Sequence, residues 1–410
     1  MKITHISTFG SGGAAKAAKR IHDQMKKDGH DSRFLFLEKG SESKYEIKYS
    51  KKLYLIDLAA RILKKMGLPP NLEQSNDFKI RRFKKKFEYF SFANTSYIDL
   101  PNHEAIQHCD IINLHFVANF IDVPSFFKNI KKPIVWTLHD MNPFQGGFHY
   151  KLDEKAYAFQ LNGLDDEQYD FKRRAFKPLS KNLLTIVTPS FWMYQKSKDS
   201  QLLRKFSHFH ISNGIDTEIF KPLNKKECAK SLEMSTNKPI VLFVAESLRN
   251  KRKGFNLVLD LVKDPNLLLK YHFVAVGEVQ NSRATKDITF LGRISDEVQM
   301  SKVYNAADFF ILPSIEDNLP NTMIESLCCG TPVVGFEVGG IKETITNGEN
   351  GFLSKEITVD GLKKALLNCD EIGMAKYGQK IAENARLKFQ LTLQTDKYIA
   401  LYNSLVRQLS

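Results

Sequence analysis

The sequence has few cysteines and no long apolar run, and each shortage excludes a class of protein. Five Cys occur among 410 residues, without C-x-x-C spacing, so we expect reduced thiols and no structural zinc. No stretch approaches the roughly 18 apolar residues of a membrane-spanning helix. The N-terminal MKITHISTFG also lacks the apolar core of a signal peptide. We therefore expect a cytoplasmic protein.

Low-complexity tracts are also missing, and the composition is that of a folded protein. Apolar residues make up 42% of the chain and charged residues 26%. At roughly 100 to 200 residues for each domain, the chain has room for two or three domains. One shared hydrophobic core is therefore not expected.

Short β-branched runs alternate with amphipathic stretches, which indicates parallel sheets with crossover helices. The pattern stops near 212–225, at SNGIDTEIFKP, and then restarts. The predicted strands are KITHIS, SRFLFL, DIINL, PIVWTL, LLTIVT and HFHIS, then PIVLFVA, KYHFVAVG, DITFLG, DFFILPS and PVVGF. This predicts an α/β protein of two doubly wound units. Polar residues such as His115, His139 and Glu316 follow strands, where open α/β sheets bind ligands, so we expect a site between the units.

Positive charge is in excess, with a net charge of +14, and much of it is local. Residues 44–90 contain 13 Lys or Arg against 5 acidic residues. One hypothesis is a peripheral contact of this segment with anionic membrane, and the alternative is an ordinary solvated domain face. A basic nucleic-acid-binding protein is a further alternative function, favoured by the net charge alone. The sequence shows no nucleic-acid recognition module, so we expect no nucleic-acid partner.

Three glycines follow the first predicted strand and open a helix in FGSGGAAKAAKR. Backbone N–H groups at Gly12 and Gly13 could approach a phosphate or a sugar, or the turn is tight for structural reasons alone. Glu38 ends the next strand, where a dinucleotide-binding fold holds a ribose. An NAD(P)-dependent oxidoreductase is therefore an alternative function.

A basic cluster in ESLRNKRKGF follows the first strand of the second unit. It contains Arg249, Arg252 and Lys253, which could neutralise a diphosphate or form a solvated loop. His139 ends an apolar strand in TLHDMNPF, so we expect its imidazole to face the ligand crevice and to hydrogen bond or act as a base.

Two acids flank a predicted helix start in EDNLPNTMIE, residues 316–325. Asn or Asp capping with a dipole-stabilising Glu explains such a stretch without any ligand. The combination of motifs suggests more. The chain resembles family 4 of the retaining glycosyltransferases, which have the GT-B fold of two Rossmann-like domains facing across a cleft. The motifs that carry the resemblance span nearly the whole chain: GSGGAAKAA, TLHD, TPS, SNGID, RKGF, FLGRISDE, PSIEDNLPNTMIESLCCGTPVVGFEVGG and NGENGFL. The wording is most similar to bacterial enzymes of exopolysaccharide and cell-surface glycan assembly.

The resemblance implies roles for the acidic stretch. Glu325 would bind the ribose hydroxyls, and the acid eight positions earlier, Asp317, would hold the donor sugar together with nearby backbone amides. The family commonly has Glu at that earlier position, so Glu316 could share its role. The donor-binding stretch then comprises Asn318, Leu319, Pro320 and Asn321.

The resemblance also implies a phosphate-binding Arg and Lys. Lys253 matches the Lys, but Glu246 stands where the Arg is expected, so we assign the second cation to Arg252 with Arg249 as the alternative. Arg293 and Ile294 lie where the family holds the base.

The implied protein is a hexosyltransferase that retains configuration, with His139 near the donor sugar. A UDP- or GDP-sugar would be the co-substrate, a glycan or lipid-linked molecule the acceptor, and fixed cations would act without a metal or a permanent cofactor. The expected domains are 1–211 for the acceptor, joined by a helix of about 392–410, and 212–391 for the donor. The inner face of the membrane is an alternative location within the cytoplasm.

Overall fold

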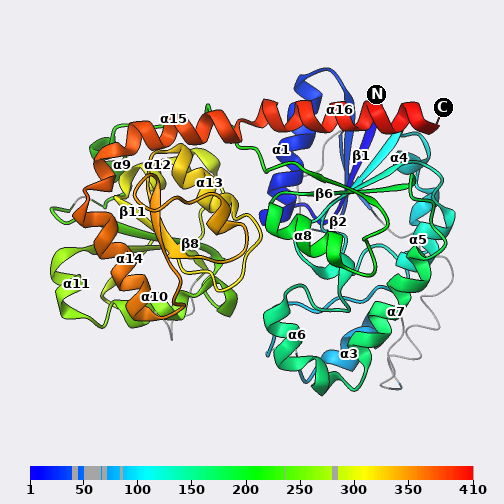
Figure 1. Ribbon diagram of the computed structural model, residues 1–410, viewed down its shortest axis with the longest axis horizontal. Coiled ribbons are helices and arrows are strands. Elements are labelled where there is room, and N and C mark those ends of the chain that lie inside the picture. The colour runs from blue at the N-terminus through cyan, green and yellow to red at the C-terminus, as the bar shows by residue number, and fades with distance from the viewer. Residues whose placement is uncertain are drawn as a thin grey trace. The chain divides into compact units, whose positions relative to one another are not determined.

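A computed structural model describes residues 1–38, 45–49, 66, 72–83, 86–234, 236–278 and 285–409. The chain divides into two compact units (Figure 1). The first comprises Met1–Ile211 and Thr395–Ser410, and the second comprises Ser212–Gln394. Each unit is built on its own parallel sheet, which confirms the predicted pair of doubly wound units.

The first sheet has the strand order β3-β2-β1-β4-β5-β6-β7, and every pairing is parallel. Its strands are β1 Lys2–Phe9, β2 Asp31–Glu38, β3 Glu46–Lys48, β4 Ile111–Leu114, β5 Ile134–Thr137, β6 Leu184–Thr188 and β7 Ser207–His210. Its helices are α1 Gly13–Lys27, α3 Leu72–Ile80, α4 Glu104–Gln107, α5 Val123–Asn129, α6 Lys151–Tyr157, α7 Leu164–Phe176 and α8 Phe191–Asp199.

Successive side chains of these strands alternate between the two faces of the sheet. One face carries Ile112, Ile134 and Ile186, which pack with residues of α5, α7 and α8. The other face carries Ile3 and Val135, which pack with α1 and α16 (Leu391–Leu409). Because both faces are covered, every residue of β4, β5 and β6 is buried, as is usual for parallel strands.

Helix α16 begins in the second unit and joins the first from Thr395 on. Its docking uses hydrogen bonds as well as apolar packing. The Tyr398 hydroxyl lies 2.9 Å from the Thr137 hydroxyl, and Asn113 donates to the Tyr402 hydroxyl at 2.5 Å. Both tyrosines are fully buried, so these bonds satisfy polar groups that water does not reach.

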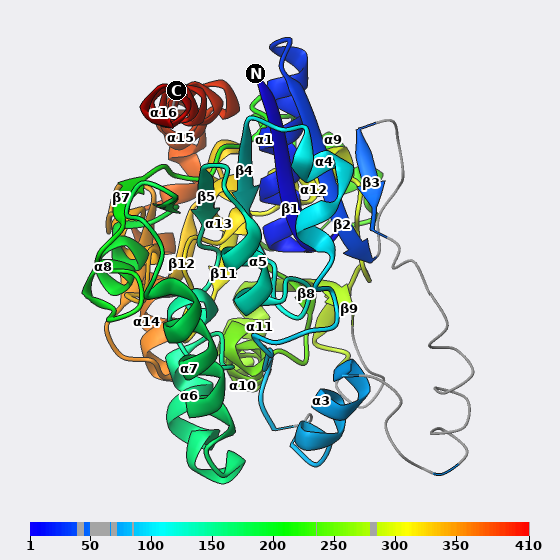
Figure 2. The ribbon, with the colours of Figure 1, turned by 90° about the vertical axis from the view of Figure 1, so that its right-hand side faces the viewer.

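A satellite cluster of aromatic side chains lies in the segments around α3 and α6. Phe87, Phe90 and Phe148 form its centre, and their rings meet edge to face or tilted. Figure 2 shows α3 and α6 beyond the carboxyl ends of the first unit's strands. Phe148 belongs to the segment between β5 and α6, so the cluster supports that segment.

The second sheet has the order β10-β9-β8-β11-β12-β13, again parallel throughout. Its strands are β8 Ile240–Ser247, β9 His272–Glu278, β10 Ile288–Phe290, β11 Phe309–Leu312, β12 Val333–Phe336 and β13 Gly351–Ser354. Its helices are α9 Lys225–Ser231, α10 Phe255–Leu261, α11 Pro265–Lys270, α12 Glu297–Ala306, α13 Asn321–Cys328, α14 Val359–Glu371 and α15 Gly378–Phe389.

Two strands, β3 and β13, were not predicted. Each lies at the edge of a sheet and is three or four residues long, too short to show a clear alternation. The five cysteines are free and buried. None of the helices in the described ranges is long and apolar enough to cross a membrane.

Candidate functional site

The basic loop of the second unit is a tight turn after β8. Residues Lys251–Lys253 form a 3-10 helix, and the Asn250 side chain caps it by accepting from the Arg252 N–H at 3.0 Å. Gly254 then takes a φ of +74°, and a Cβ there would lie 2.0 Å from the Pro313 carbonyl oxygen. Glycine is therefore required where this loop passes the end of β11.

Two further bonds fasten this loop to the segment after β11. The Ile315 N–H donates to the Arg252 carbonyl at 2.8 Å, and the Arg252 guanidinium donates to the Glu316 carbonyl at 2.8 Å. β8 and β11 are neighbours in the sheet, so their carboxyl ends bring the two motifs together. The RKGF and EDNLP motifs thus form one rigid corner.

Asp317 lies in this corner between the two predicted cations. Its carboxylate is 2.5 Å from the Lys253 ammonium and 3.4 Å from the Arg252 guanidinium, and it accepts a bond from Ser314 at 3.1 Å. Burial alone would raise the pKa of Asp317, but the charges of Lys253 and Arg252 lower it below its ordinary value. Two cations around one carboxylate leave one positive charge in excess.

A glycine pair shapes the opposite side of this corner. The Gly340 N–H donates to the Asn318 carbonyl at 2.8 Å, and Gly339 has a φ of +52°. A Cβ on Gly339 would lie 1.6 Å from the Asp317 carbonyl oxygen. The loop after β12 can therefore approach Asp317 only because the residue is glycine.

Helix α13 starts without a side-chain cap. Its N-cap is Pro320, and no side-chain hydrogen bond caps the helix. Asn321 instead accepts a bond from Asn213 at 3.0 Å, and the Leu319 carbonyl accepts from the same amide at 3.4 Å. The capping interpretation of EDNLPNTMIE is therefore wrong, and Asn213, from the segment where the predicted strand pattern stops, fixes the start of α13.

Glu325 lies on the second turn of α13 and is 6% exposed. The buried Tyr304 hydroxyl of α12 donates to its carboxylate at 3.0 Å. A buried carboxylate with an oriented partner is a group that can accept hydrogen bonds from a ligand hydroxyl. Tyr304 carries no motif signal, so the sequence did not reveal this partner.

The other predicted residues of the second unit make their contacts with groups other than Asp317. Arg293 is exposed and pairs with Glu246 at 3.3 Å. Ile294 packs against the core of the unit, and Arg249 is exposed. Of the two residues proposed as the second cation, only Arg252 is shown bonded to the acidic segment.

In the first unit, the glycine turn leads directly from β1 into α1. Gly12 is the N-cap of α1 with a φ of +95°, and its carbonyl accepts from the Lys16 N–H at 2.8 Å. A Cβ on Gly13 would meet no atom within 4 Å. Gly12 is therefore required by the backbone, whereas nothing in the protein's packing requires Gly13.

His139 follows β5 and is half-buried, but its ring is not simply turned toward solvent. Its Nε2 lies 3.1 Å from the Nδ1 of His115, which is buried after β4. Burial lowers the pKa of His139 to about 4, although the neighbouring Asp140 charge opposes this. The imidazole is therefore neutral at pH 7. One ring nitrogen thus bonds inward to His115, and the contact of this imidazole with a ligand stays a prediction.

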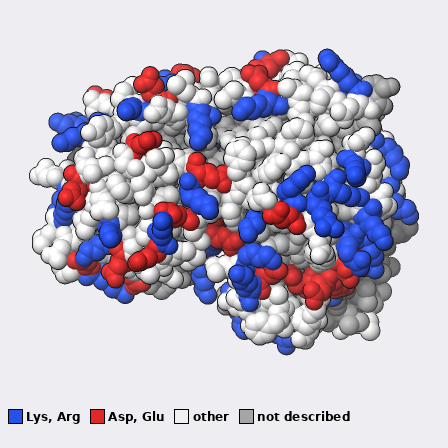
Figure 3. All heavy atoms as spheres, viewed as in Figure 1, with Lys and Arg blue, Asp and Glu red and all other residues white. Residues whose placement is uncertain are grey.

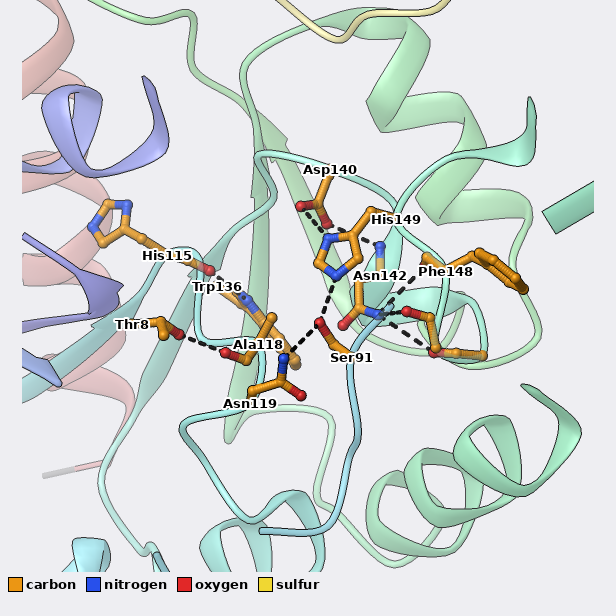
Figure 4. Close-up of polar contacts among 12 residues, drawn as sticks. Thr8, Ser91, His115, Ala118, Asn119, Trp136, Asp140, Asn142, Phe148 and His149 are labelled. Atoms are coloured by element: carbon orange, nitrogen blue, oxygen red, sulfur yellow. Dashed lines mark hydrogen bonds and ion pairs between the residues drawn. The ribbon is translucent and has the colours of Figure 1, made fainter. Parts of the chain in front are cut away.

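Figure 4 shows a Ser–His–Asp arrangement beside this loop. Asp140 accepts from the His149 Nδ1 at 2.7 Å, and the His149 Nε2 lies 2.7 Å from the Ser91 hydroxyl. Ser91 is 1% exposed and also accepts from Asn119 at 3.4 Å. A nucleophile must be reachable by its substrate, and the buried Ser91 is not. We therefore assign these hydrogen bonds a structural role, which is to hold the loop in place.

A buried lysine closes the same loop from below. The Lys172 ammonium donates to the carbonyls of Asn142, Gln145 and Gly146. Burial lowers the pKa of Lys172 to about 7. Three ammonium bonds to three carbonyls fix the turn that follows His139 and Asp140.

A groove in the first unit lies away from these groups. The groove has a volume of about 720 Å³, and residues from α5, α7 and the segment after α7 line it. Phe127 and Phe171 are among its apolar residues, and the exposed Lys128, Lys131 and Arg174 lie along it. Lys and Arg also gather on the part of the first unit shown in Figure 3. The groove contains no residue of the predicted site.

No group of three or more His, Cys, Asp or Glu in the described ranges is placed to hold a metal ion. The basic stretch KKLYLIDLAARILKKMGL lies outside the described residues, apart from Met66. The side chain of Glu38 is also outside them.

Comparisons with known proteins agree with this architecture. Residues 238–370 match the model of the family described as Glycosyl transferases group 1. The glycogen synthase of Thermodesulfovibrio yellowstonii is 25% identical over 360 residues, which cover 73% of this chain and 71% of that protein. A Campylobacter jejuni N,N'-diacetylbacillosaminyl-diphospho-undecaprenol alpha-1,3-N-acetylgalactosaminyltransferase is 30% identical over 48% of this chain and 54% of its own length.

A solved structure of Anabaena HepE in complex with UDP-glucose has the same fold. Its TM-score is 0.64 at 15% identity, and the match covers 98% of this chain and 100% of that one. Two Rossmann-like units with these relatives define a GT-B glycosyltransferase. The chain is a glycosyltransferase of the hexosyltransferase class, and the residues that match the group 1 family model lie in its second unit. The oxidoreductase alternative is not favoured.

Proposed function

We propose that the protein is a retaining glycosyltransferase that moves a sugar from a nucleotide-sugar to a glycan or lipid-linked acceptor. The observation that carries this proposal is the corner formed by Arg252, Lys253 and Asp317. Breaking a glycosyl phosphate bond leaves negative charge on the departing nucleoside diphosphate. Two cations held in place before the reaction stabilise that charge without reorganisation, and this supports action without a metal.

In this proposal the second unit, residues 212–391, binds the donor and the first unit binds the acceptor. Glu325, fixed by Tyr304, accepts from the ribose hydroxyls, and the segment from Asn318 to Asn321 binds the donor sugar. Gly12 and Gly13 of the first unit approach the diphosphate or sugar, and His139 contacts the donor sugar. Arg293 and Ile294 remain the proposed contacts of the base.

The donor is proposed to be a UDP- or GDP-sugar, and UDP has the support that HepE was solved with UDP-glucose. A lipid-linked acceptor has the support of the Campylobacter jejuni relative, whose name includes a diphospho-undecaprenol. The sequence motifs favour a role in polysaccharide or cell-surface glycan synthesis, and we propose the cytoplasm as its location.

A thermal-shift panel of UDP-, GDP- and ADP-sugars tests the donor. We expect the nucleotide-sugars of one of these three bases to raise the Tm of the wild-type protein. Glu325→Ala should weaken that donor about 10- to 100-fold, because it loses charged hydrogen bonds worth about 1.5–3 kcal/mol each. Glu349→Ala, an exposed acid of the same unit, is the control and should bind normally. No shift with any nucleotide-sugar would contradict the proposal.

Retention and metal independence have their own tests. We expect the anomeric configuration of the product to match that of the donor by NMR, and we expect activity to persist in EDTA. Inversion would remove the retaining assignment. Complete loss of activity in EDTA, restored by a divalent cation, would contradict metal independence.

Peripheral membrane contact at the inner face of the membrane is proposed for the basic 44–90 segment. The groove between α5 and α7 also supports membrane contact. Its apolar rings, with Lys128, Lys131 and Arg174 beside them, suit an anionic lipid surface. Changing these three residues to Glu should reduce sedimentation with anionic vesicles. Lys51, Lys52, Lys64 and Lys65→Glu test the segment itself. The matched control changes exposed lysines of the second unit, namely Lys364, Lys376 and Lys380. Equal sedimentation of all these variants would contradict the membrane contact.

A further inference from the structure

Behind His139, two buried histidines continue inward as a hydrogen-bonded row. The His139 Nε2 lies 3.1 Å from the His115 Nδ1, and the His115 Nε2 lies 3.0 Å from the His5 Nδ1. Neighbouring rings are stacked with centroids 5.4 and 5.3 Å apart and planes 27° from parallel in both pairs. We call these three residues the histidine row.

The sheet itself builds this row. β1, β4 and β5 are adjacent parallel strands, and His5 pairs in register with Asn113. Because side chains two residues apart share a face, His115 projects on the same face as Asn113 and His5. The row therefore crosses one strand at each step and ends at the loop after β5. Figure 4 shows His115 pointing away from the Ser91, His149 and Asp140 cluster, so the two arrangements are separate.

Both inner imidazoles are neutral. His5 is fully buried and His115 is 2% exposed. Burial, and the neighbouring histidines after it, lower the pKa of each well below its ordinary value. His22 of α1, whose ring lies edge-on to His5, has its pKa lowered to about 3 by burial and then by Lys26 and Lys19. The imidazoles of the histidine row are therefore uncharged at pH 7.

Neutral imidazole has one N–H and one lone pair, so the hydrogen bonds of the row must all run in the same direction. In the outward arrangement, His5 donates to His115, which donates to the His139 Nε2, and the His139 proton is on Nδ1. In the inward arrangement, every proton moves to the other nitrogen, and His5 carries an N–H on Nε2.

The inner end of the row distinguishes the two arrangements. The His5 Nε2 is buried and has no hydrogen-bond partner among the described residues. The outward arrangement leaves only a lone pair there, whereas the inward one buries an N–H without an acceptor. Orphaned buried N–H groups are the rarer of the two in proteins. The outward arrangement is therefore favoured.

We propose that His5 and His115 are positioning residues that fix His139 as the Nδ1–H tautomer. The Nε2 lone pair of His139 is then occupied by the His115 N–H. With that lone pair occupied, His139 is a hydrogen-bond donor and not a base. This assignment of His139 rests on the proposed function. The His139 imidazole donates a hydrogen bond to an oxygen of the donor sugar, such as a hydroxyl oxygen. Another group removes the proton from the hydroxyl that receives the sugar.

Long-range ¹H–¹⁵N correlation spectra of the full chain with labelled histidine test the tautomer directly. Signals are assigned by substitution. We expect the ligand-free wild type to show His139 protonated on Nδ1. A wild-type His139 protonated on Nε2 would overturn the proposal, and this result needs neither a variant nor a substrate.

His5→Leu breaks only the inner bond and does not touch His139. We expect it to shift His139 to a mixture of both tautomers and to lower kcat about tenfold with little change in the donor KM, as loss of one oriented hydrogen bond implies. His22→Asn changes a buried histidine outside the row and should leave the His139 spectrum unaltered. An unchanged His139 tautomer in folded His5→Leu would refute the coupling. If no nucleotide-sugar binds the wild type, the proposed function fails while the tautomer result stands.

Discussion

Replacing Asp317 with Asn separates two roles that its surroundings combine. The change removes one negative charge but keeps the size of the side chain and an oxygen that can accept. In the structure the carboxylate is the counter-ion of Lys253 and Arg252, whereas the family resemblance assigns it to the donor sugar. If the counter-ion role dominates, the variant should be less stable when empty yet bind diphosphate well.

The magnitude follows from burial. Removing one partner of a buried ion pair costs about 3–5 kcal/mol. The Arg252 side chain is 9% exposed, but that of Lys253 is 24% exposed and can move into water. We therefore expect a loss of about 2–3 kcal/mol. At about 2–4 °C for each kcal/mol in a unit of this size, the Tm of the second unit should fall by about 4–12 °C.

The assay compares thermal shifts with UDP and with the matching UDP-sugar. A bound diphosphate replaces the missing carboxylate, so UDP should raise the Tm of Asp317→Asn by more than that of the wild type. Glu349→Gln removes the same charge at an exposed position of the same unit and is the matched control. An unaltered Tm together with an unaltered UDP shift would refute the counter-ion argument. Loss of the difference between UDP-sugar and UDP would instead support the sugar-binding role.

The same carboxylate gives a pH dependence with a definite sign. The folded pKa of Asp317 is lowered by Lys253 and Arg252, so the folded state binds fewer protons than the unfolded state as the pH falls. Its contribution to stability is complete above the unfolded pKa of about 3.9 and is lost as pH falls through the folded pKa. Asp317→Asn should therefore lose less stability than the wild type in acid below that range, which urea titrations at several pH values can measure.

Four other substitutions test the supports around the site. Gly13→Ala should fold normally, since its Cβ meets no atom within 4 Å, and any loss of donor affinity by calorimetry would show a ligand close by; Gly12→Ala, at φ +95°, should lose about 1 kcal/mol in urea titration. Tyr304→Phe should weaken donor binding about tenfold by removing the bond to Glu325, and unchanged affinity would contradict that role. Tyr402→Phe should lower the free energy of unfolding by about 1–2 kcal/mol in urea without changing the donor KM. An unchanged free energy of unfolding would mean that water satisfies the side-chain amide of Asn113, which bonds to Tyr402.

The sequence predicted the two sheets because buried parallel strands are apolar runs bounded by polar residues and glycine. It also predicted that the basic loop and the acidic segment share an edge of the second sheet, since both follow strands. Their contact is confirmed by the Arg252 and Asp317 pair. The edge strands were not predicted because they are only three or four residues long. The uncapped start of α13 was not predicted because the bond that fixes it comes from Asn213, 108 residues away.

The sequence alone thus determined the class of fold and the residue types available for chemistry, which depend on local periodicity and motif spacing. Only the tertiary structure decided how those residues are paired. It placed Tyr304 on Glu325, made Asp317 a shared counter-ion and aligned His5, His115 and His139 across three strands. The physical reason is that strand order and register bring together side chains that are 21 to 110 residues apart in these pairs, and no local pattern records such contacts.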